Sequence, residues 1–70
     1  MRPIRYRIIA EDLRQRITSG EFRLGAVLPS EADLSATYEA SRVTVRRALE
    51  ALRSDGLVES RQGFGWLVSA

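Results

Sequence analysis

The sequence contains no cysteine and no histidine, and all 11 of its basic residues are arginine. The missing cysteine excludes a disulfide framework and a thiolate site. The missing histidine removes the commonest general base and the commonest metal ligand. No lysine is present to act as a nucleophile either, and the Asp and Glu residues have no metal-binding-loop spacing. We therefore predict that the protein is not an enzyme and has no catalytic residue, no metal site and no cofactor.

Long apolar runs are also missing. The longest run is too short to cross a membrane, and no signal-peptide core follows the N-terminal charges. We therefore expect a cytoplasmic protein without a membrane partner. Its 70 residues are enough for one small domain. The formal net charge is only +2. A charge this small favours binding to a polyanion through specifically positioned contacts rather than through non-specific electrostatic attraction.

The most informative stretch is a helix predicted between Ser41 and Gly56. Ser41 is a suitable N-cap, and Gly56 is a suitable left-handed stop. Apolar residues at helical spacing form one narrow stripe that we expect to be buried: Val45, Ala48, Leu49 and Leu52.

The opposite side of this helix is expected to carry its polar residues. They are Arg46, Arg47 and Glu50. The apolar Val43 lies on the same side, and Arg42 flanks it in the first turn. Arginine suits bidentate contacts with phosphate and guanine. A helix that buries one side and presents arginines near its N-terminal end matches what reading of the DNA major groove requires. Taken alone, the pattern also fits the solvated face of an ordinary amphipathic helix.

An earlier helix is predicted over residues 6–19, because its apolar residues share one side at helical spacing. A connector over residues 20–29 follows, with two glycines and a proline. Within it, residues 26–28 could form a short strand that pairs with a more C-terminal segment. We expect Phe22, Leu24 and Leu28 to hold the connector on the core.

A second short helix is predicted over residues 30–38. Ser30 and Asp33 have the spacing of a capping box. Only two residues then remain before Ser41 opens the arginine-bearing helix. Two capped helices joined by a tight turn form a helix-turn-helix, and here the arginine-bearing helix comes second, as DNA recognition requires.

The last part of the chain changes to strand patterns. Residues 57–61 and 66–68 are predicted to be strands, and residues 62–65 form the turn between them. Alternation leaves open whether Trp66 or Leu67 faces the core. A hairpin directly after a helix-turn-helix is a wing. The sequence therefore predicts a mainly α fold with a small β-hairpin, a winged helix-turn-helix of three helices plus a two- or three-stranded wing sheet.

One further pattern runs along nearly the whole chain. Its pieces, in order, are Ile9 to Ile17 with Ser19-Gly20-Glu21, Leu24-Gly25, Leu28-Pro29-Ser30-Glu31, Ser41-Arg42-x-Thr44-Val45-Arg46-x-Ala48-Leu49, Leu52, Gly56-Leu57-Val58 and Gln62-Gly63-x-Gly65. Their order and spacing resemble the N-terminal winged helix-turn-helix domain of GntR-type bacterial transcription regulators.

The resemblance implies sequence-specific binding of double-stranded DNA, with the helix over residues 41–55 in the major groove and the wing over residues 57–68 at the adjacent minor groove. The positions matching Arg42, Thr44 and Arg46 touch bases or phosphates in that family. The glycine matching Gly63 lies at the wing tip. The full set of DNA-binding residues that we predict is Ser30, Ser41, Arg42, Val43, Thr44, Arg46, Arg47, Arg61, Gln62 and Gly63.

The chain departs from the family pattern at two positions. Ala32 stands where the family usually has an arginine that contacts DNA, so one family contact is missing. Trp66 stands where threonine is usual. An indole is bulky and requires a hydrogen-bond acceptor for its N–H. We therefore expect this departure to affect the placement of the wing tip.

The resemblance also implies further partners. Members of the family carry a C-terminal domain that binds a small-molecule effector and supplies most of the homodimer contact. The chain ends at Ala70, so we expect an excised DNA-binding domain that, in the full-length dimer, binds an inverted repeat in the bacterial nucleoid. Its start is most similar to the subgroup whose effector domain has a chorismate-lyase-like fold. The alternative is a winged helix that serves protein–protein assembly without specific DNA readout.

Overall fold

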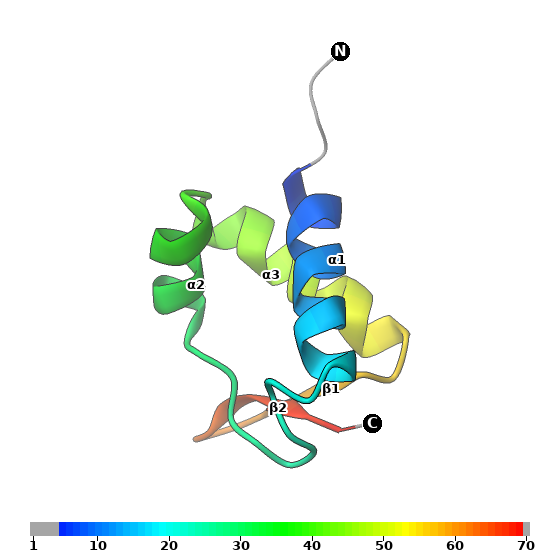
Figure 1. Cartoon of the computed structure of the whole chain (residues 1–70). Coiled ribbons are helices and arrows are strands. Elements are labelled where there is room, and N and C mark those ends of the chain that lie inside the picture. The colour runs from blue at the N-terminus through cyan, green and yellow to red at the C-terminus, as the bar shows by residue number, and fades with distance from the viewer. Residues whose placement is uncertain (1–4, 70) are drawn as a thin grey trace.

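The computed structural model describes residues 5–69. It contains α1 (Arg5–Thr18), α2 (Glu31–Tyr38), α3 (Arg42–Ser54), β1 (Val58–Arg61) and β2 (Gly65–Val68). Helix α1 crosses α3, α2 stands beside the start of α3, and the strands form a hairpin below the helices (Figure 1). The predicted mainly α fold with three helices and a wing hairpin is confirmed, and the sheet has two strands.

Both predicted N-caps are present. The Ser30 hydroxyl accepts from the backbone N–H of Asp33 at 3.0 Å, and the Ser41 hydroxyl accepts from that of Thr44 at 3.1 Å. Each cap satisfies one of the donors that a helix leaves unpaired in its first turn. The starts of α2 and α3 are therefore fixed by short-range sequence signals.

The end of α3 forms the predicted left-handed stop. Gly56 has a φ of +80°. Its N–H donates to the carbonyl of Arg53 at 2.9 Å, and the N–H of Leu57 donates to that of Leu52 at 3.0 Å. This pair of bonds is a Schellman motif, which favours glycine because a Cβ disfavours positive φ. The chain then turns directly into the hairpin.

The turn between α2 and α3 depends on a residue that the sequence did not mark. Glu39 ends α2 in the left-handed conformation, with a φ of +52°. A non-glycine residue there costs about 1–2 kcal/mol. The N–H of Ala40 donates back to the carbonyl of Ser35 at 3.1 Å, and Arg5 Nη1 donates to the carbonyl of Glu39 at 3.2 Å. These bonds hold the turn that sets α3 against α2.

A single hydrophobic core joins all five elements. The predicted stripe of α3 is buried completely, and it packs with residues of both other helices and of both strands. The connector between α1 and α2 reaches this core through Leu28 and the half-buried Phe22. The expectation for Leu24 was wrong, because its side chain is 69% exposed. The side chains buried most completely are Leu13, Leu34, Val45, Leu49, Leu52 and Val58.

The hairpin is antiparallel, with Val58 opposite Val68 and Arg61 opposite Gly65. Trp66 is buried and faces the core, whereas Leu67 points to the other side and is half-buried. This answers the question that alternation had left open. Strand β2 begins one residue earlier than predicted, and β1 begins one residue later.

The predicted pairing of residues 26–28 exists as a single antiparallel bridge between Val27 and Leu67. The N–H of Leu28 donates to the carbonyl of Trp66 at 2.8 Å, and the N–H of Val68 donates to that of Ala26 at 2.9 Å. These bonds fix the wing to the connector that leads into α2.

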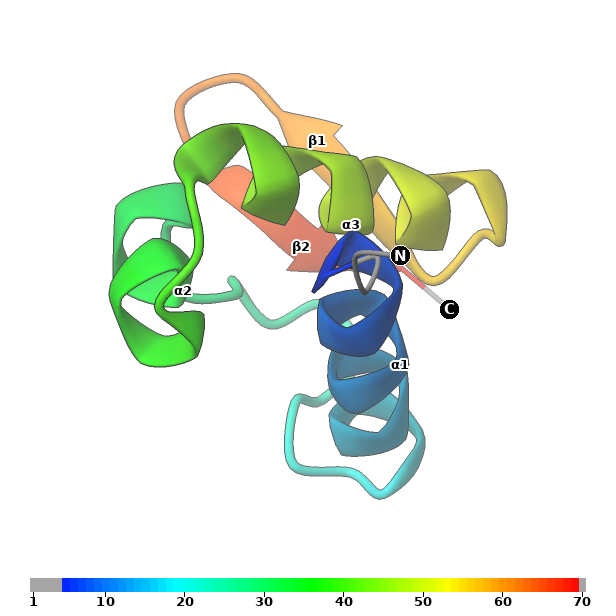
Figure 2. The same cartoon turned by 90° about the horizontal axis from the view of Figure 1, so that it is seen from above.

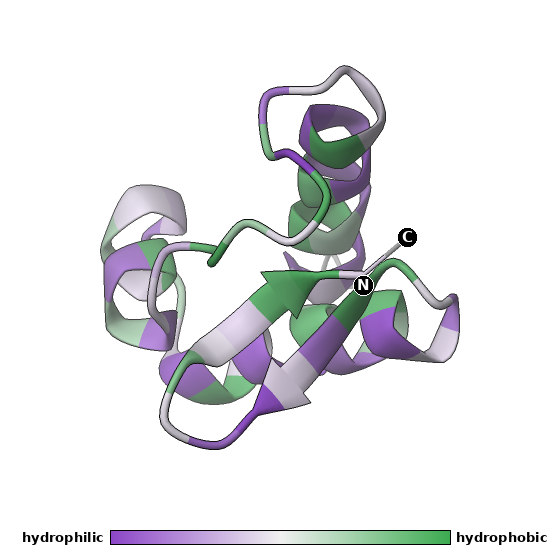
Figure 3. Ribbon diagram, turned by 90° about the horizontal axis from the view of Figure 1, so that it is seen from below, coloured by the Kyte–Doolittle hydropathy of each residue, from purple (hydrophilic) through white to green (hydrophobic). Residues whose placement is uncertain are grey.

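The hairpin turn and the start of α3 lie on the same side of the molecule, together with α2 (Figure 2). Viewed from below, the hairpin lies beneath the helices and its turn projects beyond them (Figure 3). Within residues 5–69, none of the helices combines the length and the apolar character that a membrane span requires.

Candidate nucleic-acid interface

One groove joins the start of α2, the start of α3 and the hairpin turn. Five of the ten predicted DNA-binding residues line it, although they come from three separate segments of the sequence. These residues are Ser30, Arg42, Arg61, Gln62 and Gly63. The fold therefore brings the start of the helix-turn-helix and the tip of the wing to one surface, as Figure 2 shows for the elements.

Arg42 is one of two exposed arginines that line this groove, and Arg61 is the other. Arg42 lies in the first turn of α3. Among residues 5–69, its guanidinium has no hydrogen bond and no ion pair. Its charge is one of the causes that lower the pKa of Glu31, after hydrogen bonds from Arg46 and Trp66. All five N–H donors of Arg42 are thus available to an anion or a base edge.

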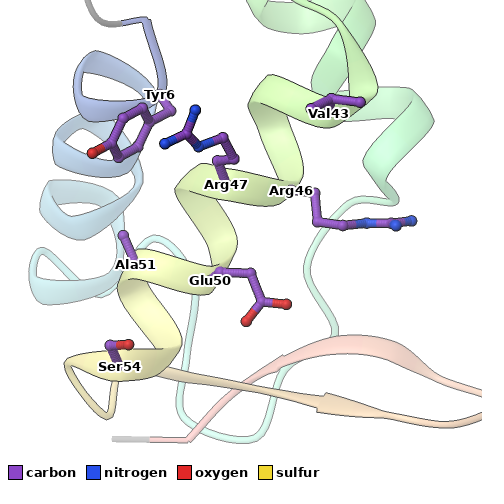
Figure 4. A pocket seen from close by; sticks show the side chains of 7 residues that line it. All are labelled: Tyr6, Val43, Arg46, Arg47, Glu50, Ala51 and Ser54. Atoms are coloured by element: carbon purple, nitrogen blue, oxygen red, sulfur yellow. The ribbon is translucent and has the colours of Figure 1, made fainter.

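The exposed side of α3 carries a second group of predicted residues. Val43, Arg46 and Arg47 line a shallow hollow there, together with Glu50. The two arginines diverge: Arg47 extends toward α1, and Arg46 extends away from α1 (Figure 4). The three arginines at the start of α3 therefore do not form one cluster.

Arg47 is held against α1. Its guanidinium carbon lies 4.8 Å from the centroid of the Tyr6 ring, which is a cation–π geometry. The pKa of the Tyr6 hydroxyl is lowered mainly by a hydrogen bond with Arg7, with a smaller contribution from the charge of Arg47. Arg47 remains exposed. Its charge thus lies at the hollow on the exposed side of α3, with an orientation set by α1.

Arg46 is held by Glu31 of α2. Arg46 Nη2 donates to Glu31 Oε1 at 2.8 Å, and Arg46 Nε donates to Oε2 at 3.3 Å. Trp66 Nε1 donates to the same Oε2 at 3.0 Å. These hydrogen bonds, first from Arg46 and then from Trp66, lower the pKa of the Glu31 carboxyl, so it is charged near neutral pH.

The Ser41 and Thr44 hydroxyls lie 2.9 Å apart and form a hydrogen bond with each other. The Ser41 hydroxyl is also the N-cap acceptor, so the pair stiffens the first turn of α3. Thr44 is half-buried, and its predicted DNA contact is limited to the exposed part of its side chain.

The wing tip presents little charge of its own. Arg61 is paired with Glu59 on the same strand at 3.0 Å. Gln62 and Gly63 are exposed at the turn, and the Phe64 N–H donates to the carbonyl of Arg61 at 3.0 Å. Gly63 is the third residue of this turn and has a φ of +87°. A positive φ at the third residue is the requirement of a type II β-turn, and glycine meets it most easily. At Gly63 the backbone can therefore come close to another surface, whereas the neighbouring Phe64 side chain is 63% exposed.

Sequence reasoning missed three residues of this surface: Tyr6, Glu31 and Trp66. Tyr6 and Glu31 each contact a predicted arginine, and Trp66 contacts Glu31. The unusual indole at position 66, with its need for an N–H partner, was the one available signal. Among residues 5–69 there is no cluster of three or more acidic residues that could hold a metal ion.

Comparison with known proteins identifies the family. Residues 5–68 match the bacterial regulatory proteins of the gntR family. The chain is 44% identical over 63 residues to the mannosyl-D-glycerate transport/metabolism system repressor MngR of Escherichia coli K12, covering 90% of this chain and 26% of MngR. It is 44% identical over 66 residues to the probable transcriptional regulator PhnF of the same strain, covering 94% of this chain and 27% of PhnF. The chain thus spans about a quarter of the length of these relatives.

Solved structures agree with this assignment. The DNA-binding domain of AraR in complex with operator ORR3 superposes with a TM-score of 0.90 at 33% identity, covering 99% of this chain and 82% of that domain's chain. A GntR-family transcriptional regulator from Listeria monocytogenes gives a TM-score of 0.88 at 25% identity, covering 97% and 59%. The relatives are described as regulators of transcription, in agreement with the expectation that the chain is not an enzyme. The chain belongs to the GntR family of bacterial regulatory proteins.

Proposed function

We propose that this domain binds double-stranded DNA sequence-specifically as the DNA-binding part of a transcription regulator. Helix α3 enters the major groove, and the hairpin turn enters the adjacent minor groove. The groove lined by Ser30, Arg42 and residues 61–63 carries the proposal, because it places a helix start, an unpaired arginine and the wing tip on one face. The similarity to the DNA-binding domain of AraR, which is bound to an operator, supports DNA binding by this domain.

The residues have different roles in this proposal. Arg42, Thr44 and Arg46 contact base edges or phosphates in the major groove, since a guanidinium can donate two hydrogen bonds to guanine. The N-termini of α2 and α3, capped by Ser30 and Ser41, donate backbone N–H groups to phosphates. Val43 adds apolar contact, and it is 70% exposed.

Two of the predicted cations are better suited to the DNA backbone than to bases. Arg47 is stacked on Tyr6, and Arg61 is paired with Glu59. Phosphate contacts need charge nearby but little orientation, so these arginines can add affinity from where they lie. Arg53 is exposed near the end of α3 and is a further candidate for such a contact.

The proposal extends to a full-length protein. As in the family, a C-terminal effector domain binds a small molecule and joins two copies into a homodimer. Two recognition helices held about 34–36 Å apart then match an inverted repeat. A regulator of this kind acts in the cytoplasm, at the nucleoid. The 70-residue chain is itself the DNA-binding domain in this scheme.

The test is selection of bound duplexes from a random library with the 70-residue chain, followed by titration of the enriched duplex at several salt concentrations. We expect one motif to be enriched. We expect the affinity to fall linearly in log K against log salt, because phosphate contacts release counterions. A chain that enriches no motif, or whose binding is insensitive to salt, would instead favour a winged helix that serves protein–protein assembly.

A further inference from the structure

Trp66 and Arg46 contact the same carboxylate, although one belongs to β2 and the other to α3. That carboxylate is Glu31, in the first turn of α2. Its Oε2 accepts from the Trp66 indole at 3.0 Å and from Arg46 Nε at 3.3 Å, while its Oε1 accepts from Arg46 Nη2 at 2.8 Å. One side chain therefore links the wing, the first helix of the helix-turn-helix and the recognition helix.

The geometry of the Arg46 guanidinium leaves it able to bind DNA while it is held. Glu31 occupies the edge formed by Nε and Nη2. The N–H groups of Nη1 and the second N–H of Nη2 remain, and these form the end-on edge that can donate to two acceptors of a guanine. The Arg46 side chain is 63% exposed, so this edge is accessible. A side chain already fixed in orientation loses less rotamer freedom on binding.

The contact with Trp66 explains why Glu31 is itself fixed. The Glu31 side chain is only 20% exposed, and Trp66 is 7% exposed. A hydrogen bond that is shielded from water holds geometry better than an exposed ion pair does.

We propose that Glu31 and Trp66 are positioning residues for Arg46, so that the base preference at the operator position contacted by Arg46 depends on the wing strand. This inference rests on the proposed function. Trp66 holds Glu31, Glu31 aims Arg46, and Arg46 makes the contact. The departure from threonine at position 66 thus supplies a link between the wing and the recognition helix.

The test uses Trp66→Phe in the 70-residue chain, with the duplex enriched by selection and its single-base variants. Phenylalanine keeps an aromatic ring in the core but removes the N–H. We expect the preference for the enriched base pair at one operator position to fall about threefold to tenfold, because Arg46 keeps its own bonds to Glu31 and loses only the part of its orientation that Trp66 supplies. Binding to random duplex and its salt dependence should not change, since no phosphate contact is removed.

Two further variants separate positioning from stability. In an Arg46→Ala background, Trp66→Phe should leave the remaining base preference unchanged, because the residue through which it acts is absent. Tyr38→Phe is the matched control, since it removes another aromatic donor to a carboxylate, the bond from Tyr38 Oη to Asp12 Oδ2 at 2.6 Å. It should lower the melting temperature without altering base preference.

Glu31→Gln provides the second route if Trp66→Phe does not fold. Glutamine offers one acceptor oxygen instead of two, so it cannot accept from Trp66 and from both Arg46 donors at once. We expect the same loss of base preference. If a folded Trp66→Phe or Glu31→Gln variant keeps the wild-type base preference, the inference is wrong and the proposed function still stands. The same holds if the variant loses as much base preference in the Arg46→Ala background as it does in the wild-type chain. A wild-type chain that enriches no duplex overturns the proposed function, and the inference with it.

Discussion

Arg47 of α3 lies over the ring of Tyr6 of α1, with 4.8 Å between the guanidinium carbon and the ring centroid. The contact joins the recognition helix to the helix that supports it. It also turns Arg47 away from Arg46 (Figure 4). Arg47 is thus oriented by α1, and Arg46 is oriented by α2.

The first prediction concerns the energy of this pair. In a double-mutant cycle with Tyr6→Ala and Arg47→Ala, we expect a coupling energy of about 0.5–1 kcal/mol, the range for an exposed cation–π contact. Urea denaturation measures it. Tyr6→Phe is the control, because it keeps the ring face and should retain most of the coupling. A coupling energy of zero would show that Arg47 is not held by α1 in solution.

The second prediction concerns Arg42. We expect Arg42→Ala to lose about 1–3 kcal/mol of binding free energy on the enriched duplex, if its unpaired guanidinium contacts a base. The loss on random duplex should be smaller. Arg23→Ala removes the same charge from the exposed connector and should change neither value much. Equal losses on both duplexes for Arg42→Ala would make it a phosphate contact.

Local signals account for most of the fold. Three kinds of local signal act through neighbours in sequence: the two serine N-caps, the glycine stop after α3 and the apolar stripe of α3. The sequence pattern was therefore sufficient to predict these features. The turn before α3 was predicted to be tight, but its conformation was not, because Glu39 is not a residue type that marks a left-handed position.

The site was harder to predict for a physical reason. The sequence identifies which residues can donate to DNA, and it placed Arg42, Arg46 and Arg47 on the exposed side of α3 correctly. It cannot identify their partners, because the contact between Arg46 and Glu31 joins residues of different helices, and the one between Arg47 and Tyr6 does the same. Such pairs depend on how the elements pack.

The third prediction tests the packing of α3. Leu49 is fully buried, so we expect Leu49→Ala to lower the free energy of unfolding by about 2–5 kcal/mol. A domain of this size has about 3–5 kcal/mol to lose. The variant should therefore be largely unfolded at 37 °C in a thermal melt. Glu50→Ala, on the exposed side of the same helix, should melt close to wild type. A Leu49→Ala melt equal to wild type would contradict the orientation of α3.

The fourth prediction uses the pKa of Tyr38, which burial and then donation to Asp12 raise to about 12. The folded state thus binds the phenol proton more tightly than the unfolded chain, whose tyrosine titrates near pH 10. The stabilisation is fully present below about pH 10 and is lost as the pH rises toward 12. The difference in stability between wild type and Tyr38→Phe should therefore shrink over that range. A difference that stays constant would show that the Tyr38 proton is not held by the fold.

The last prediction uses Ala32, which is exposed in the first turn of α2, beside the groove at the start of that helix. An arginine there adds positive charge at the positive end of the helix dipole, at a cost of about 0.3–1 kcal/mol in stability. If α2 approaches DNA as it does in the family, the same side chain meets a phosphate. The slope of log K against log salt should then become more negative by about 0.9. We therefore expect Ala32→Arg to bind DNA more tightly while melting at a slightly lower temperature. Ala32→Gln, which adds length without charge, is the control and should leave the slope unchanged. An unchanged slope and affinity for Ala32→Arg would mean that the start of α2 lies away from the DNA in this protein.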